Sequence, residues 1–151
     1  MFRGVNPINL DAKGRMAMPS RYRESIAAYC AGQMVATIDA QSPCLLLYPL
    51  PDWEEIQAKI DALPSFNAAA VRLKRLLIGH ATDIELDGSG RMLLPSPLRD
   101  YASLDKRVVL LGQGRKFEIW SEELWNQTRD DYLKEVGSPD TIPDEMLSLS
   151  L

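Results

Sequence analysis

Two short segments of the chain hold an aspartate and an arginine at the same spacing, Asp11 with Arg15 and Asp87 with Arg91. Each pair encloses a glycine, so the pattern predicts a tight turn in which the aspartate binds loop amides and orients the arginine. An oriented guanidinium presents a planar set of donors that matches phosphate groups and the edge of guanine. The pattern therefore indicates a structural aspartate–arginine pair that stabilises the turn, or an arginine oriented for nucleic-acid recognition, and the two roles are compatible.

The two segments belong to one longer internal repeat. The stretch Leu10–Arg23 recurs as Leu86–Arg99, 76 residues later, with 8 of 14 positions identical. Because an internal repeat fixes the architecture, the sequence predicts two tandem modules in an α+β fold with a pseudo-two-fold repeat. A module of this size is near the lower limit for an independent core, so we expect the two halves to share a core or to lean on neighbouring subunits.

Each module is expected to contain a β-hairpin, a helix, two strands and a second helix. The predicted boundaries are residues 1–66 for the first module, 67–81 for a connecting helix, 82–136 for the second module and 137–151 for an irregular tail. In each hairpin, the strands on either side of the turn are expected to pair with each other. Ser20 and Ser96 are expected to cap the first helix of their modules, and Asp52 with Glu55 predicts a capping box for the next helix.

Basic residues are concentrated in the first half of the chain. Residues 1–76 carry nine Lys or Arg against seven Asp or Glu, a net charge of +2, whereas residues 77–151 carry eight against fourteen, a net charge of −6. A basic patch indicates phosphate binding even in an acidic chain, although a solvated surface with uneven charge is the alternative. The candidate DNA-binding residues are Arg3, Lys13, Arg15, Arg21 and Arg23.

The sequence offers few residues or motifs for catalysis or metal binding. The chain has one histidine and two distant cysteines, and it carries no metal-ligand, P-loop or nucleophile-elbow motif. We therefore expect no catalytic residues, no metal, no cofactor and no small-molecule substrate. The N-terminal segment has no apolar stretch and no apolar run is long enough for a membrane span, so we expect a cytoplasmic protein with Cys30 and Cys44 reduced.

Several motifs along the whole chain together resemble the MraZ family of bacterial transcriptional regulators. These are the stretches 1–4 (MFRG), 10–15 (LDAKGR), 32–35 (GQMV), 44–51 (CLLLYPLP), 75–81 (RLLIGHA) and 86–91 (LDGSGR). The resemblance implies two tandem AbrB-like modules of the swapped-hairpin type and a ring-shaped homo-oligomer. It also implies a nucleoid-associated repressor of its own operon and of downstream division and cell-wall genes, binding double-stranded DNA at short repeated promoter boxes. The family's D-x-x-x-R signature falls on Asp11 with Arg15 and on Asp87 with Arg91.

The two copies differ at charged positions. Ser89 stands where the first copy has Lys13, and Pro97 stands where it has Arg21. The second turn therefore offers less positive charge, and we expect Arg91 to pair with Asp87 or a neighbouring subunit rather than with DNA.

Other classes of function are weaker alternatives. The hairpins of an assembly or interaction protein would mediate subunit contacts, and an antitoxin-like AbrB module would usually carry one hairpin and a disordered toxin-binding arm. An enzyme has the least support from these residues.

Overall fold

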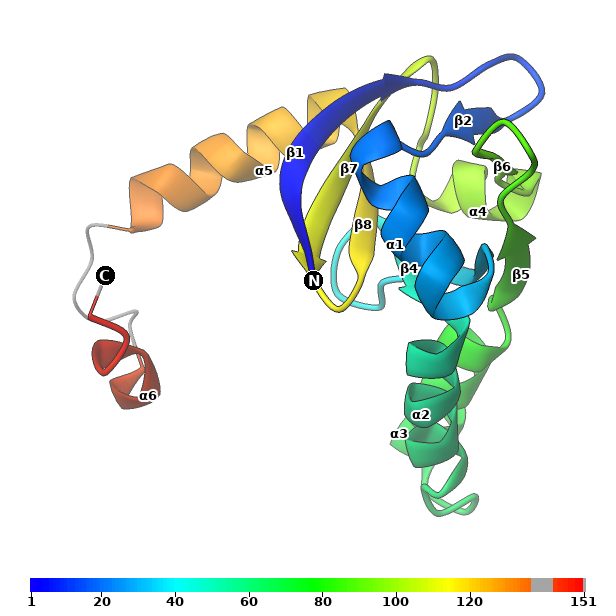
Figure 1. Cartoon of the computed structure of the whole chain (residues 1–151). Helices are drawn as coiled ribbons and strands as arrows, with labels where there is room; N and C mark the ends of the chain where they lie inside the picture. The colour runs from blue at the N-terminus through cyan, green and yellow to red at the C-terminus, as the bar shows by residue number, and fades with distance from the viewer. Residues whose placement is uncertain (137–142, 151) are drawn as a thin grey trace.

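The computed structural model describes residues 1–136 and 143–150 as a mixed α+β fold (Figure 1). Its strands are β1 (Phe2–Asn9), β2 (Arg15–Ala17), β3 (Gln33–Ile38), β4 (Leu45–Pro49), β5 (Thr82–Glu85), β6 (Arg91–Leu93), β7 (Arg107–Gly114) and β8 (Phe117–Ser121). Its helices are α1 (Ser20–Cys30), α2 (Leu50–Asp61), α3 (Ala68–Leu73), the π-helical turn η1 (Lys74–Ile78), α4 (Ser96–Tyr101), α5 (Glu122–Glu135) and α6 (Asp144–Leu147).

The strands on either side of each turn pair with strands of the other copy of the repeat, so the expected pairing within each hairpin is wrong. Six strands form one antiparallel sheet in the order β1-β7-β8-β4-β3-β5, and β2 pairs with β6 in a separate ribbon. The first strand of each copy thus pairs with the third strand of the other, β1 with β7 and β5 with β3. Each turn is still closed by a backbone bond, such as Asp11 N–H to Arg15 O at 2.9 Å, but its two strands then diverge.

The sequence repeat is a pseudo-two-fold relation in the structure. In the ribbon, Met16 pairs with its equivalent Met92. In the sheet, Leu46 on β4 pairs with Glu118 on β8, which lies 72 residues later at the corresponding place. Equivalent residues meet at the centre of both ladders, so the exchange of strands joins the two copies across one axis.

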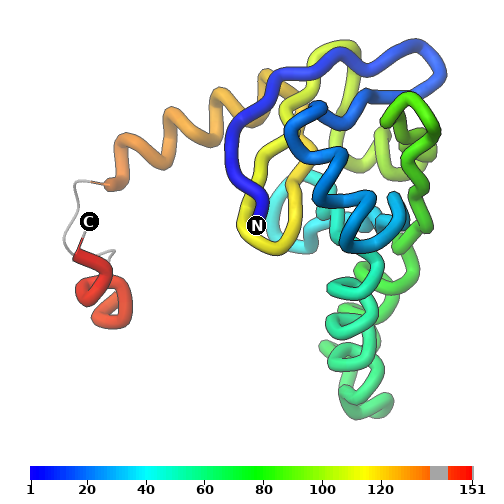
Figure 2. The backbone as a smooth tube through the Cα atoms, in the orientation of Figure 1, coloured from blue at the N-terminus to red at the C-terminus, as the bar shows by residue number. Residues whose placement is uncertain are grey.

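The shared core lies on one face of the six-stranded sheet, under α1, α4 and the ribbon. Its fully buried side chains come from both copies and include Met16, Met34, Leu47, Met92, Leu110 and Phe117. This confirms the expectation of a common core, because one cluster contains residues of both copies. The backbone trace in Figure 2 shows how the two copies wrap around each other.

The opposite face of the sheet carries two smaller clusters, one for each copy. Val35 and Tyr48 pack under η1 and Trp53 of α2, while Val109 and Trp120 pack under the start of α5. Beyond these contacts, α2 with α3 extends from the sheet in one direction and α5 projects in another (Figure 1).

Two of the expected helix starts are wrong. The N-caps of α1 and α4 are Pro19 and Pro95, and neither helix has a side-chain cap, so Ser20 and Ser96 are already helical residues. The proline ring fixes φ at this position, at −53° for Pro19 and −63° for Pro95, which restricts the backbone just before the helix.

The predicted capping box at Asp52 is also absent. Helix α2 begins earlier, at Leu50 after Pro49, which places Asp52 inside its first turn. There Asp52 is buried and accepts hydrogen bonds from the Tyr29 hydroxyl at 2.5 Å and from Arg115 Nε at 3.2 Å. Its carboxylate therefore joins α1, α2 and the β7–β8 turn instead of capping a helix.

The region after α5 differs in part from the irregular tail that was expected. Residues 137–142 and 151 lie outside the described part of the chain, but Asp144–Leu147 form the short helix α6. Within the described residues, no helix has the length and apolarity that crossing a membrane requires.

Candidate nucleic-acid interface

The two signature arginines lie on the same exposed face of the β2–β6 ribbon. Arg15 is paired across the ribbon with Leu93, and Arg91 is paired with Ala17. Met16 and Met92 point into the core, so alternation along each strand turns the residues on either side of them outward. A two-stranded antiparallel ribbon of this kind fits the major groove of DNA.

A turn precedes each ribbon strand and holds its arginine. Asp11 Oδ1 accepts hydrogen bonds from the backbone N–H groups of Lys13 and Arg15, both at 2.9 Å, and its Oδ2 accepts one from Arg15 Nε at 2.9 Å. In the second copy, Asp87 Oδ1 accepts from the backbone of Ser89 at 2.8 Å and of Arg91 at 2.9 Å, and Arg91 Nε lies 3.3 Å from Asp87 Oδ2. Both aspartate–arginine pairs are therefore formed, and each guanidinium is oriented from the side of its turn.

These bonds keep both aspartates ionised. The backbone N–H of Arg15 is the largest cause that lowers the pKa of Asp11, to about 2. Desolvation is the next largest effect and opposes it, and the Arg15 side chain and the Lys13 backbone N–H lower the pKa further. The pKa of Asp87 is likewise lowered, first by the backbone N–H of Arg91. At neutral pH each carboxylate thus carries its charge and keeps its arginine in place.

The Asp11 carboxyl is expected to titrate with a midpoint near pH 2 in the folded protein, and Arg15→Ala should raise this pKa without restoring the ordinary value of about 3.9. The reason is that the backbone N–H of residue 15 stays in the variant. Since the folded pKa lies below the unfolded one, the turn's contribution to stability is complete above about pH 4 and is lost as the pH falls toward 2.

Carboxyl carbon shifts measured by NMR against pH follow this titration directly. Arg91→Ala serves as the matched control, because it removes an equivalent arginine and should leave the midpoint of Asp11 unchanged. A midpoint of Asp11 at the ordinary value in Arg15→Ala would show that the side chain, and not the backbone, sets the pKa.

Two further arginines, Arg23 and Arg99, contact the turns and stabilise them. Arg23 Nε donates to Met18 O at 2.7 Å and packs against Gly90 of the other copy's turn, and its equivalent Arg99 donates to Leu94 O at 2.9 Å and packs against Gly14. Gly14 and Gly90 have φ of +88° and +74°, and a Cβ at either would lie within 2.6 Å of the arginine side chain. Arg23 thus belongs to the ribbon as a support for the second turn. Sequence reasoning missed Arg99, although the repeat aligns it with Arg23.

Arg3 and Arg21 lie on opposite faces of the first half of β1, because Arg21 contacts the even-numbered positions and Arg3 is at an odd-numbered one. Arg21 donates to Asn6 Oδ1, contacts Gly4 and lies over the Tyr22 ring with its Cζ 4.9 Å from the centroid. Arg3 is exposed on β1 beside Gly4. The five candidate residues are therefore divided, with Lys13, Arg15 and Arg23 around the ribbon and its turns and the other two on the sheet edge.

Within residues 1–136 and 143–150, one group of side chains has the donor types of a metal site. Asp39, Cys44 and Glu118 place their ligand atoms within 4.8 Å of one another. Burial is the main cause that strongly raises the pKa of the Cys44 thiol, and this thiol lies 3.6 Å from Asp39 Oδ2 as a hydrogen-bond donor. Glu118 accepts a bond from Trp120 Nε1 at 2.9 Å. A protonated thiol and a carboxylate already in use fit a polar structural cluster, and we assign no metal to it.

Comparison with known proteins gives a consistent result over the whole chain. The sequence model of the MraZ family, described as "MraZ protein, putative antitoxin-like", matches residues 1–76 and 77–140. Relatives named "Transcriptional regulator MraZ" are 61% identical in Alkalilimnicola ehrlichii, 58% identical in Halorhodospira halophila and 55% identical in Pseudomonas aeruginosa. Each of these alignments covers 100% of both proteins.

Proposed function

Because this chain belongs to the MraZ family, whose members are named transcriptional regulators and not enzymes, we propose that it is a sequence-specific DNA-binding repressor. Its targets are its own operon and the downstream division and cell-wall genes, and it acts in the cytoplasm at the nucleoid. The observation that carries the proposal is the exposed ribbon with Arg15 and Arg91 on one face. The exchange of strands between the copies supports two AbrB-like modules of the swapped-hairpin type.

The ribbon is the part that enters the major groove, which is about 12 Å wide in B-DNA. Arg15 contacts base edges or phosphate from one end of the ribbon, and Lys13 adds charge beside it at the turn. The aspartates keep the guanidinium groups in position before DNA arrives, which lowers the entropy lost on binding. Arg23 supports the second turn, and Arg3 and Arg21 add positive charge on the two faces of β1.

A single ribbon offers few contacts, so affinity has to come from several ribbons acting together. We propose a ring-shaped homo-oligomer that places ribbons at regular spacing on short repeated promoter boxes. Linked sites of matching geometry gain affinity through effective concentration, without any new contact.

The protein is expected to bind its own upstream DNA with an affinity that falls steeply with salt. Each phosphate contact should contribute roughly 0.9 to the slope of log affinity against log salt concentration. Gel-shift titrations at several salt concentrations measure this slope, and footprinting locates the boxes.

DNA fragments with one box serve as the comparison for fragments with repeated boxes. A single isolated box that binds as tightly as the full promoter would contradict the role of several ribbons. An oligomer that shows no preference for its upstream DNA would instead favour an assembly or interaction protein.

A further inference from the structure

The outer face of the β2–β6 ribbon carries one large apolar side chain. Along both strands, buried residues alternate with outward ones, and four outward side chains form this face, those of Arg15, Ala17, Arg91 and Leu93. Leu93 is 54% exposed, and it belongs to none of the apolar clusters of the described residues. Packing within the described part of the chain therefore gives no reason for a leucine at this position.

Leu93 lies directly beside the first signature arginine. It is the cross-strand partner of Arg15 in the ribbon. Residues opposed in this way on an antiparallel pair have their Cβ atoms about 4.5–5.5 Å apart on the same face. Successive bases lie about 3.4 Å apart along a strand of DNA. When Arg15 contacts a base edge, the Leu93 side chain therefore meets the same base pair or the next one.

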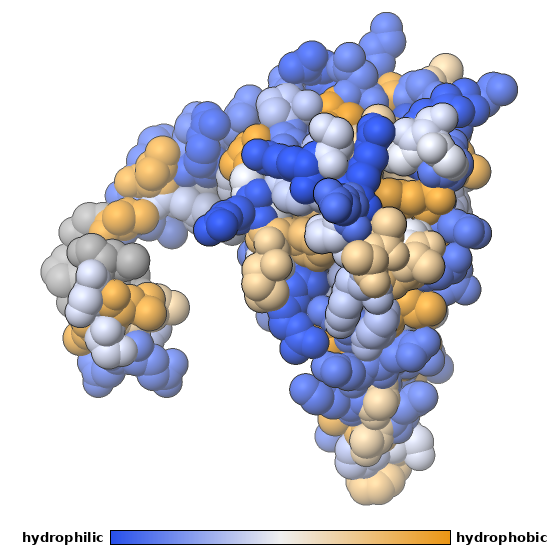
Figure 3. Space-filling view, viewed as in Figure 1, coloured by the Kyte–Doolittle hydropathy of each residue, from blue (hydrophilic) through white to orange (hydrophobic). Residues whose placement is uncertain are grey.

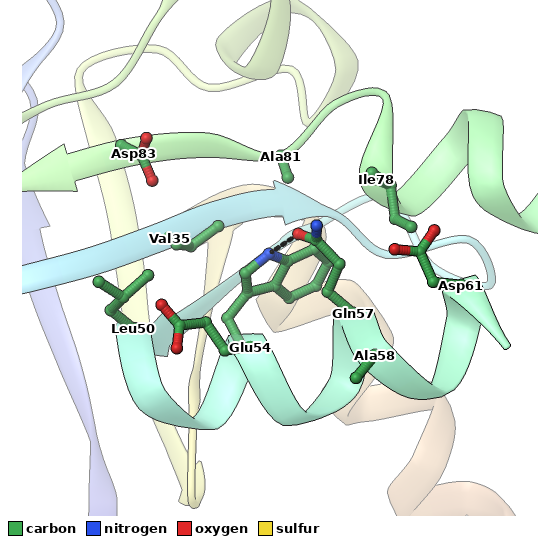
Figure 4. Close-up of a pocket in the computed structure, with 10 residues that line it drawn as sticks. Val35, Leu50, Glu54, Gln57, Ala58, Asp61, Ile78, Ala81 and Asp83 are labelled. Atoms are coloured by element: carbon green, nitrogen blue, oxygen red, sulfur yellow. Dashed lines mark hydrogen bonds between the residues drawn. The ribbon is translucent and has the colours of Figure 1, made fainter.

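The far side of the sheet from the ribbon is unsuited to DNA, because it is acidic. A groove of about 450 Å³ lies there between α2 on one side and η1 with β5 on the other (Figure 4). The carboxylates of Glu54, Asp61 and Asp83 surround it, none of the described residues that line it is basic, and like charge repels phosphate. In the region of the ribbon and its turns, Figure 3 shows hydrophilic side chains with hydrophobic ones among them. DNA therefore approaches from the ribbon, where Leu93 lies.

The chemistry of leucine restricts what it can recognise in DNA. Its side chain neither donates nor accepts a hydrogen bond, so it cannot read the donors and acceptors of the base edges. The major groove also presents one apolar group, the C5-methyl of thymine. We propose that Leu93 contacts this methyl group on a thymine beside the base that Arg15 contacts, and so determines part of the sequence specificity. This inference deepens the proposed function and rests on it.

The other half of the ribbon lacks this contact. The repeat places Ala17 where the second copy has Leu93, and Ala17 takes the same outward position opposite Arg91. Its side chain ends at Cβ, three carbons short of a leucine, so it does not reach a methyl group at the same depth in the groove. Dependence on a thymine methyl is therefore expected at one place in each box, beside the base that Arg15 contacts.

Replacement of thymine by deoxyuridine tests this contact, because it removes the C5-methyl group and leaves base pairing unchanged. The upstream DNA is prepared with one thymine replaced at a time, at the same position of every box, and gel-shift titration gives the affinity of the wild type for each. Affinity is expected to fall at one position by about fourfold per box, the factor that corresponds to burial of a single methyl group. Replacement at the other thymines should change it little.

A leucine variant then assigns the effect to its side chain. Leu93→Ala is expected to weaken binding to unmodified DNA at least fourfold and to bind the deoxyuridine DNA equally well, because the partner of the methyl group is gone. Leu149→Ala is the matched control, since it makes the same change at a leucine that is 60% exposed and lies outside the ribbon. It should keep both the affinity and the deoxyuridine effect of the wild type. Size-exclusion chromatography and thermal unfolding should show that both variants keep the oligomeric mass and the fold.

The outcomes separate this contact from the DNA-binding function. If the wild type binds its upstream DNA but no thymine depends on its methyl group, or if Leu93→Ala keeps that dependence, the Leu93 contact is wrong and the repressor function stands. Loss of the oligomeric mass in Leu93→Ala would also overturn it, because the leucine would then serve a contact between copies of the chain. A wild type that does not bind the upstream DNA at all would contradict the repressor function and this contact together.

Discussion

An Arg15→Ala variant is expected to keep the fold and the oligomeric mass of the wild type and to lose most of its affinity for the upstream promoter DNA. Arg15 lies on the exposed face of the ribbon, and its bond to Asp11 is at a half-exposed surface where an ion pair contributes little to stability. A bidentate contact to a base is worth about 1–3 kcal/mol, and a tenfold change in affinity corresponds to about 1.4 kcal/mol. Because several subunits lose this contact at once, the total loss should exceed that of a single site.

Gel-shift titration and size-exclusion chromatography test the two halves of this expectation. Arg72→Ala is the matched control, since Arg72 is an exposed arginine on α3, away from the ribbon. Arg91→Ala is expected to weaken binding less than Arg15→Ala, because Ser89 stands beside it where the first turn has Lys13. An Arg15→Ala oligomer that binds the promoter as the wild type does would exclude the ribbon as the DNA interface.

Phe117→Ala is expected to cause the largest loss of stability of any variant considered, about 3–5 kcal/mol in the free energy of unfolding. The Phe117 side chain is fully buried and joins elements from both copies. Its ring stacks on Phe2 of β1 with a centroid separation of 4.2 Å and meets the edge of Tyr22 of α1 at 5.0 Å. Removal of this ring leaves a cavity between the exchanged strand and the helix, and the rigid sheet cannot collapse to fill it.

Urea unfolding monitored by circular dichroism measures this loss. All proteins should be compared at one concentration, because the stability of an oligomer depends on it. Phe66→Ala makes the identical change at a residue that is 93% exposed and should alter the free energy of unfolding by less than about 0.5 kcal/mol. Similar effects of the two substitutions would mean that Phe117 is not part of a tightly packed core.

The turns could be predicted from sequence because their chemistry is local. An aspartate that accepts bonds from amides two and four residues later, and a glycine with positive φ, act within five residues of chain. The partner of a strand is a different matter. The alternation along β1 shows which side chains face a core. Its partner β7 begins about 100 residues later, and no local signal in β1 identifies β7 as the partner. Because the strands are exchanged between the copies, the expected hairpins do not form, although their turns do.

For the candidate interface too, the sequence predicts the local features but not the contacts between distant segments. Arg15 and Arg91 were identified from their spacing, yet only the pairing of β2 with β6 places them on one surface. The bracing role of Arg23 depends on Gly90, which belongs to the other copy and is far away in sequence. Asp52 was assigned to a helix cap on local grounds, whereas burial beside Tyr29 and Arg115 gives it a tertiary role.

The pairing of two unequal copies gives the ribbon a direction. A ribbon made by two identical chains would look the same from either end, and such a symmetric reader matches palindromic sites. Here one end carries Lys13 and the other Ser89, and Arg15 faces Leu93 while Arg91 faces Ala17. The backbone keeps its symmetry while the side chains break it. A subunit of this kind can distinguish the two orientations of a DNA site, so several subunits in one orientation would read boxes that all run the same way along the duplex.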